Sequence, residues 1–292
     1  MKRLRIPLLL DLLRVNDPSA IAAVADDARF DRAFVGRGPL LNRIVLRRVR
    51  NALSLDGRPL PPVAPRGPRR PTAAQGELEA RLNPIAAGLG GGDPSLGPLA
   101  SYVRGETPAA AVGPLTQEAV GQLFAPAYKG DAQSWSAAKV LDQAPRTLNL
   151  FALSWWALTG RVAKARELLS EKVGHDPSGV HGTGVAVHNI VKSFTRMRAL
   201  WADPQARRRL SPEAAAAQCL TAPQQVIRQP LTAGLSLAGD FSDATLILLQ
   251  LNAANARAPS AEIAFMKQSW ARCPAHAWVP ALLAGVWRTA QG

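Results

Sequence analysis

The pattern of apolar and polar residues is most regular in the second half of the chain. Apolar positions recur at three- and four-residue intervals in 115–124, 134–143, 153–173 and 182–201, and this period is typical of amphipathic helices. A shorter helix is expected at 211–220, where serine can cap the first turn and proline occupies it. This half is therefore predicted to be mainly helical.

The N-terminal residues 1–56 also read as helical. Asp17 and Pro18 form a cap-and-proline pair at which a helix can begin. The opening "MKRLRIPLLLDLLR" is basic and then apolar, but Asp11 and Arg14 interrupt the apolar run, which is too short to span a bilayer. We expect an amphipathic helix that rests on the protein, with contact to a membrane surface as the alternative.

One segment departs from the helical pattern. Residues 235–251 hold two short β-prone runs around turns at Gly239-Asp240 and Ser242-Asp243, which predicts a small hairpin. The sequence therefore predicts a mainly α fold with a small β unit.

Two stretches interrupt the pattern and suggest how the chain is divided. Residues 56–71 are dense in proline and arginine, which favours an extended linker or strap, and 88–98 are rich in glycine. We expect an N-terminal helical segment over 1–56, a Pro/Gly/Arg-rich connecting segment over 57–98 and a main helical domain over 99–292.

Composition and charge narrow the class of protein. With 47% hydrophobic and 19% charged residues, the chain has enough apolar surface to form a core. Its net charge of +14 would attract an acidic protein, an anionic lipid or a nucleic acid. Because no zinc-finger, helix-turn-helix or basic-zipper pattern is present, specific nucleic-acid binding is not expected.

The two cysteines, Cys219 and Cys273, form neither a disulfide framework nor a C-x-x-C pair. Together with the lack of a secretory pattern, this predicts a reducing cytoplasmic location. Cys273 follows Arg272 and precedes a tryptophan-rich run that predicts a helix, so a nearby cation and a helix N-terminus could favour its thiolate. Taken alone, a single cysteine among apolar residues is more often an ordinary core thiol.

The order of elements over 175–292 resembles the C-terminal half of a cytochrome P450. A long helix, a shorter helix ending in "QQVIRQP", a small β unit, the phrase "NAANARAP" and a cysteine before a terminal helix follow one another. In that family the long helix crosses the heme, a later helix carries Glu-x-x-Arg, and a loop delivers the axial cysteine. Gln225 and Arg228 occupy the places of that Glu and Arg, and Cys273 occupies that of the ligand.

Other matches are looser. The phrase at 253–259 is similar to Ala-Ala-Asn-Arg-Asp-Pro, and Thr183 fits the oxygen-activation motif with His181 in the acidic place. Upstream, 15–34 is similar to an early helix of bacterial members, and Trp135 is spaced four residues from a lysine like a pair that grips a heme propionate. Both glycines of the usual cysteine loop are missing, and the chain is shorter than family members usually are.

The resemblance implies a P450-like helical fold of reduced size that binds heme. Cys273 would be the metal ligand, and Arg228 would either brace its loop or grip a propionate. Thr183 and His181 would act on the opposite side of the heme. The implied cofactor-binding residues are Cys273, Arg228, Trp135, Lys139 and Arg272.

The implied activity is oxidation or oxygenation of a small apolar molecule, as a monooxygenase or with peroxide. The implied electron donor is an acidic ferredoxin-type protein, which a basic surface could dock.

Three alternatives stay open. The chain could be a P450-derived scaffold that has lost heme and acts as a protein partner or stabiliser, or an unrelated helical binding protein. The DDxxxD pattern at 26–31 could bind magnesium and diphosphate, although no second acidic motif accompanies it.

Overall fold

The computed structural model describes residues 2–32, 35–55, 57–60, 73–89, 93–145, 155–156, 158–257 and 260–292. Its internal contacts define two units. We call Met1–Gly76 with Ala222–Cys273 the sheet unit, and Glu77–Thr221 with Pro274–Gly292 the helical unit. The three segments expected from composition stay a prediction, and most of the proline-rich stretch lies outside the described residues.

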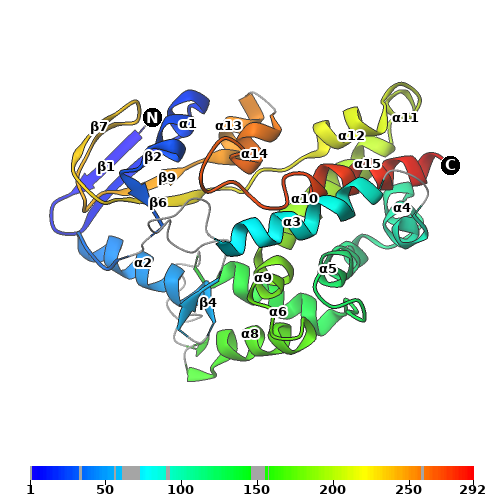
Figure 1. The fold of residues 1–292 in the computed structure, drawn as a ribbon, viewed down its shortest axis with the longest axis horizontal. Coiled ribbons are helices and arrows are strands. Elements are labelled where there is room, and N and C mark those ends of the chain that lie inside the picture. The colour runs from blue at the N-terminus through cyan, green and yellow to red at the C-terminus, as the bar shows by residue number, and fades with distance from the viewer. Residues whose placement is uncertain are drawn as a thin grey trace. The chain divides into compact units, whose positions relative to one another are not determined.

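A five-stranded sheet forms the centre of the sheet unit (Figure 1). β2 and β9 pair in parallel, with Leu12 opposite Leu246, and the other neighbouring strands are antiparallel. In sheet order the strands are β1 (Lys2–Ile6), β2 (Leu10–Val15), β9 (Leu246–Leu249), β6 (Val226–Pro230) and β3 (Phe30–Asp31).

The predicted N-terminal helix is wrong, because β1 and β2 form an antiparallel hairpin there. A short apolar run is compatible with a strand as well as with a helix, so the spacing of its apolar residues does not distinguish the two. Pro7 disfavours a helix interior and instead lies in the turn between the strands. Leu12, Leu13 and Val15 of β2 are buried in the sheet.

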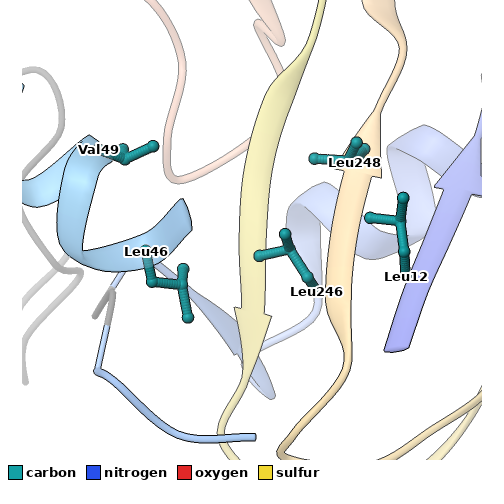
Figure 2. Packing of buried hydrophobic residues seen from close by; sticks show 5 residues of the cluster. All are labelled: Leu12, Leu46, Val49, Leu246 and Leu248. Atoms are coloured by element: carbon teal, nitrogen blue, oxygen red, sulfur yellow. The ribbon is translucent and has the colours of Figure 1, made fainter. Parts of the chain in front are cut away.

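Two helices follow the hairpin. α1 (Pro18–Asp26) begins where the sequence predicts, with the Asp17 carboxylate accepting the Ala20 N–H at 2.9 Å. α2 (Leu40–Ala52) packs an apolar side against the sheet. Figure 2 shows this packing, in which the residues are Leu12, Leu46, Val49, Leu246 and Leu248.

A small hairpin is present, as predicted, with β7 (Gly234–Ser236) paired with β8 (Gly239–Phe241). The predicted turn at Gly239-Asp240 is wrong, because these residues belong to β8, and the second predicted run is β9 of the main sheet. The predicted helix ending in "QQVIRQP" is wrong over its last part, because Val226–Pro230 is a strand. The remaining elements of the sheet unit are β4 (Ser54–Leu55), β5 (Arg58–Pro59), α13 (Leu251–Arg257) and α14 (Ala261–Phe265).

The helical unit is organised around one long helix. It consists of α9 (Pro177–His181), a single π-helical turn (Gly182–Ala186) and α10 (Val187–Trp201). α10 contacts α4, α5, α12 and α15. The bounds of those four are Gly97–Arg104, Val112–Gln122, Pro212–Cys219 and Trp278–Gln291.

The other elements complete the helical layer (Figure 1). They are η2 (Pro94–Leu96), η3 (Ala109–Ala111), α6 (Ala132–Gln143), α8 (Arg161–Lys172), α11 (Pro204–Arg209) and α3 (Ala73–Gly88), which begins in the sheet unit.

The helices predicted in this half are confirmed, including the Ser211 cap of α12, whose hydroxyl accepts the Ala214 N–H at 3.1 Å. The predicted single helix at 153–173 is wrong in its first part, because a turn at Thr159-Gly160 precedes α8; residues 153–154 and 157 lie outside the described ones. Trp201 and Trp287 meet edge-to-face at 5.0 Å in the core.

Among the helices that the structure describes, none is both long enough and apolar enough to cross a bilayer.

Candidate functional site

The cysteine loop, residues 265–273, is closed by a backbone hydrogen bond. The N–H of Cys273 donates to the carbonyl of Phe265 at 2.8 Å. The buried side chain of Gln75 donates to the carbonyl of Arg272 at 2.7 Å. The residues on either side of the Arg272–Cys273 peptide are therefore anchored by the rest of the sheet unit.

The two cysteines have different environments, although both are free thiols. Cys219 is buried, and burial raises the pKa of its thiol to about 12. Cys273 is only half-buried. The expectation that it directly precedes a helix is wrong: α15 starts at Trp278, after an intervening turn. The field of a helix N-terminus falls off within one turn, so it gives Cys273 little support.

Two buried arginines flank one aromatic ring of the cysteine loop. The guanidinium carbons of Arg32 and Arg228 lie 4.7 and 5.7 Å from the centroid of Trp270. Arg32 is 5% exposed and Arg228 1%. Asp31, also buried, supplies a negative charge that acts on both. We call these four residues the arginine cluster.

The guanidinium of Arg228 is incompletely hydrogen-bonded. One Nη donates to the carbonyl of Ile227 at 2.9 Å, and the other lies 3.8 Å from the sulfur of Met266, a weak acceptor. Its buried Nε has no hydrogen-bond partner among the described residues. A buried donor without an acceptor is costly, so this side chain has capacity to bind another group.

The cluster holds more positive than negative charge. Burial, together with the nearby charge of Arg32, lowers the pKa of Arg228 to about 9, against the opposing effect of Asp31. Burial likewise lowers the pKa of Arg32 to about 10. Both remain cations at neutral pH. Of these groups, the Nε of Arg228 is the donor that is left for another acceptor among the described residues.

The expected pairing of Gln225 with Arg228 one turn along a helix is wrong. α12 already ends at Cys219, Gln225 lies in an irregular segment, and Arg228 projects from β6. Arg228 contacts the cysteine loop all the same, through Met266 and Trp270.

Thr183 lies in the π-turn of the long helix and is fully buried. Its hydroxyl donates to the carbonyl of Gly179 at 2.7 Å. Its own carbonyl accepts from the Gln117 amide at 3.0 Å, and the same amide donates to the Ser134 carbonyl at 3.0 Å. Ser134 returns a hydrogen bond from its hydroxyl to Gln117 at 2.7 Å.

We call Gln117, Ser134 and Thr183 the glutamine clamp, because one amide joins α5, α6 and the π-turn. Such π-turns often occur at functional sites. Here the hydrogen bonds of the Gln117 amide hold the π-turn to α5 and α6.

Two further predicted residues lie on α6. Trp135 is half-buried, with its ring 4.7 Å from the ring of His188 and against Gly113, where a Cβ would clash with the indole. Lys139 is exposed, with its ammonium 5.7 Å from the Trp135 ring. His188 also contacts the Ala138 carbonyl at 3.1 Å.

His181 is half-buried at the end of α9. The seven-residue spacing to His188 would put both on one face of a regular α-helix. The intervening π-turn shifts that register, so the expectation of a shared face no longer holds.

The DDxxxD pattern does not form a metal centre. Asp27 makes a salt bridge to Arg29 at 2.6 Å, whereas Asp31 belongs to the arginine cluster. Across the described ranges, no group of three or more His, Cys, Asp or Glu residues could hold a metal ion. A cavity of about 460 Å³ beside α1 is lined by Asp26, Asp27 and Glu262, so its charge is unsuited to an anion.

No protein-family model and no curated protein sequence matches the chain. Solved structures do. P450 RauA, complexed with a biosynthetic intermediate of aurachin RE, matches with a TM-score of 0.64 and 12% identity over 99% of this chain and 85% of RauA. A six-coordinated cytochrome P450 from Thermus thermophilus matches with a TM-score of 0.61 and 16% identity, over the same shares of both chains.

CxnD, a cytochrome P450 enzyme for C–S bond formation in chuangxinmycin biosynthesis, has a TM-score of 0.60 and 14% identity over 96% of this chain and 79% of its own. The fold is thus that of a cytochrome P450, in a shortened and divergent form. The resemblance drawn from the order of elements is confirmed at the level of the fold.

Several residues of the candidate site escape sequence reasoning. Arg32, Gln75 and Gln117 contact the loop or the π-turn from distant positions, so spacing along the chain gives no signal for them. Trp270 lies in the loop itself. Arg32 stands next to the acidic pattern at 26–31 and reads there as a flanking charge. These residues are Arg32, Gln75, Gln117 and Trp270.

Proposed function

We propose that this protein binds heme, with Cys273 as the axial ligand, and oxidises or oxygenates a small apolar molecule. The observation that carries the proposal is the arginine cluster against the cysteine loop, within a P450 fold. A fold alone does not define an activity, whereas two buried cations against the loop that carries a half-buried cysteine are features of a site.

The residues present fit both ends of a heme. Heme offers an iron that takes a thiolate ligand and two carboxylates that pair with guanidinium groups. Cys273 supplies a half-buried free thiol. Arg228 supplies an Nε donor without a partner among the described residues, and Arg32 adds a second buried cation.

The chain's own residues would have distinct roles. The Cys273 sulfur would hold the iron, with the Gln75 hydrogen bond to the Arg272 carbonyl fixing the adjacent peptide. Arg228 and Arg32 would hold the carboxylates in a buried place where the attraction is weakly screened. When bound, a heme-thiolate centre supplies the oxidising chemistry. Arg272 would add positive charge next to the sulfur.

Residues of the long helix would handle protons. The Thr183 hydroxyl already donates its proton to the Gly179 carbonyl at 2.7 Å, so in this arrangement it can accept a hydrogen bond but has no proton to donate outward. Proton delivery by His181 stays a prediction. The propionate roles of Trp135 and Lys139 stay predictions.

An acidic electron-transfer protein of the ferredoxin type is the proposed redox partner. The net charge of +14 supports electrostatic docking. The rate of reduction should then fall as ionic strength rises, because salt screens exposed charges.

A heme-free scaffold is the second candidate. It is favoured by the bulky Met266 and Trp270 in a loop where glycines are usual. Both side chains are buried and contact the Arg228 guanidinium, so they fill space that a bound group would need. In this case the protein would act by binding another protein.

The absorption spectrum after reduction under carbon monoxide separates the two candidates. The purified protein, produced with heme supply or titrated with hemin, should show the red-shifted Soret band of a thiolate-ligated heme. Cys273→Ala should lose this band, whereas Cys219→Ala should keep it, since that thiol is buried in a different unit. A protein that takes up no hemin, or a Cys273→Ala variant with an unchanged spectrum, would overturn the proposal.

A further inference from the structure

The turn of the first hairpin and the start of α2 form one continuous surface. The N–H groups of Leu40 and Leu41 donate to the carbonyls of Leu8 and Leu9, at 3.1 and 2.9 Å. The first N–H groups of a helix have no acceptor within the helix. The hairpin turn supplies two acceptors here, and the two segments are thereby fixed to each other.

This surface carries a group of exposed apolar side chains. Leu8 is 92% exposed and has a φ of +61°, a conformation that is strained for a branched residue. Single exposed leucines are ordinary, but a contiguous group with a strained leucine at its tip is not. We call the group the leucine ridge; it consists of Ile6, Leu8, Leu9, Leu40, Leu41 and Ile44.

The opposite side of α2 is fixed, so the ridge cannot fold inward. Leu46 and Val49 pack on the sheet (Figure 2). The buried amide of Asn42 donates to the carbonyls of Asp11 at 2.7 Å and Ala244 at 2.9 Å. The exposed side of the helix is therefore held toward solvent by packing and by hydrogen bonds.

Arginines accompany the ridge along α2. The helix contains Arg43, Arg47, Arg48 and Arg50 and no acidic residue along its length. Three of the four are exposed, as is Arg5 on β1. The surface is thus apolar at its tip and basic along its flank.

We propose that the leucine ridge and the arginines of α2 bind the surface of an anionic lipid bilayer. The leucines would enter the boundary between headgroups and acyl chains, and the guanidinium groups would pair with lipid phosphates. Three of its six apolar residues lie in the N-terminal segment for which membrane contact was the alternative, but there they form a hairpin turn joined to α2 and not an amphipathic helix. The proposal does not depend on heme.

The charges favour a bilayer over the other occupants of such a surface. In a two-fold dimer built on this face, the α2 arginines of the two copies would face each other. An acidic protein would pair with the arginines but would also need a pocket for Leu8, whereas a bilayer accepts a projecting leucine anywhere on its surface.

Vesicle flotation with the full chain tests the proposal. Protein should float with vesicles of phosphatidylcholine and phosphatidylglycerol, and much less with phosphatidylcholine alone. Leu8→Asn keeps a residue that tolerates positive φ and should lower the partition coefficient by about tenfold through the lost apolar contact. Leu237→Asn, at a 65% exposed leucine in the turn between β7 and β8, should bind like the unaltered protein.

The basic flank is tested by Arg43→Gln with Arg47→Gln. Each lost charge should weaken binding by about fivefold at low salt. Arg208→Gln with Arg209→Gln, on exposed positions of α11, is the matched control. Equal losses in the paired controls, or equal flotation with neutral and anionic vesicles, would overturn the proposal. The proposal would also be overturned if the protein did not float with vesicles and instead formed a concentration-dependent dimer that Leu8→Asn abolishes.

Discussion

The arginine cluster and the glutamine clamp are both buried polar groups, but they differ in how completely they are satisfied. In the clamp, the amide of Gln117 makes two donated bonds and one accepted bond, all between 2.7 and 3.0 Å, and no formal charge is involved. In the cluster, two cations share one carboxylate, and a donor of Arg228 is left over among the described residues.

A satisfied network fixes the positions of helices, and its removal should reduce stability. A buried cation with a donor left over, such as Arg228, reduces stability by itself and is better explained by a ligand. The two groups can therefore be compared by removing the central side chain of each: replacing Gln117 should destabilise the fold, whereas replacing Arg228 by an apolar residue should not.

The largest effect is expected from Asp31→Asn. This change removes the negative charge that acts on Arg32 and Arg228 while keeping the shape and the acceptor for the Arg32 N–H. Both buried cations would then lose the attraction of this carboxylate, and the free energy of unfolding should fall by about 3–5 kcal/mol. Urea denaturation followed by circular dichroism measures it. Adding Arg228→Met should restore part of the loss; no such rescue would mean that the two charges are independent.

A somewhat smaller loss is expected from Gln117→Leu. The carbonyls of Ser134 and Thr183 and the Ser134 hydroxyl would lose their partner in a buried place. The expected cost is about 2–3 kcal/mol of unfolding free energy. Gln122→Leu, at a partly buried residue of the same helix bonded at 3.4 Å to Glu118, is the control. If both variants unfold at the same urea concentration, the clamp does not stabilise the fold.

A residue next to the clamp, Asp131, should make a pH-dependent contribution of about 1 kcal/mol to the free energy of unfolding. Asp131 caps α6, and its bonds from Lys172 and from the Ser134 N–H lower the pKa of its carboxyl to about 2. Because this pKa lies below the ordinary value, the stabilisation is complete above about pH 4 and is lost as pH falls through about 2.

Asp131→Ala should lose about 1 kcal/mol at neutral pH. Asp131→Asn should keep much of the cap and lose the dependence on pH between about 4 and 2. Equilibrium unfolding across this range compares the two variants with the unaltered protein. A dependence that persists unchanged in Asp131→Asn would assign the acid sensitivity to other carboxyl groups.

The smallest effect on stability is expected from Arg228→Met. The free energy of unfolding should rise by no more than about 1 kcal/mol, because an apolar side chain of similar length replaces a poorly paired buried charge. Hemin affinity, measured by spectroscopic titration, should fall in the same variant. A large loss of stability with unchanged hemin affinity would make Arg228 a structural residue and remove the contrast with the clamp.

Sequence reasoning succeeded where structure is local. The caps at Asp17 and Ser211 and the period of the helices around Trp135 depend on neighbouring residues, and all are found in the structure. The P450 fold was accessible because the order of elements survives when individual motifs do not.

It failed where distant segments decide the outcome. β2 is a strand because β9 lies beside it, and nothing within 1–56 reveals that partner. Arg228 was assigned to a helix because its spacing from Gln225 imitates a motif, whereas pairing with β9 makes that segment a strand. The arginine cluster joins residues near position 30 with others near 230 and 270, so no local pattern could predict it.

The pairing of β2 with β9 has a consequence for biosynthesis. Leu12 leaves the ribosome long before its partner Leu246 is made, a delay of roughly 10–50 s at ordinary rates of translation. During this time β1 and β2 can form their hairpin, but the other edge of β2, with its apolar side chains, stays open to wrong partners. Yield on expression should therefore depend on chaperone capacity and on the speed of elongation, even for variants whose final stability is unchanged.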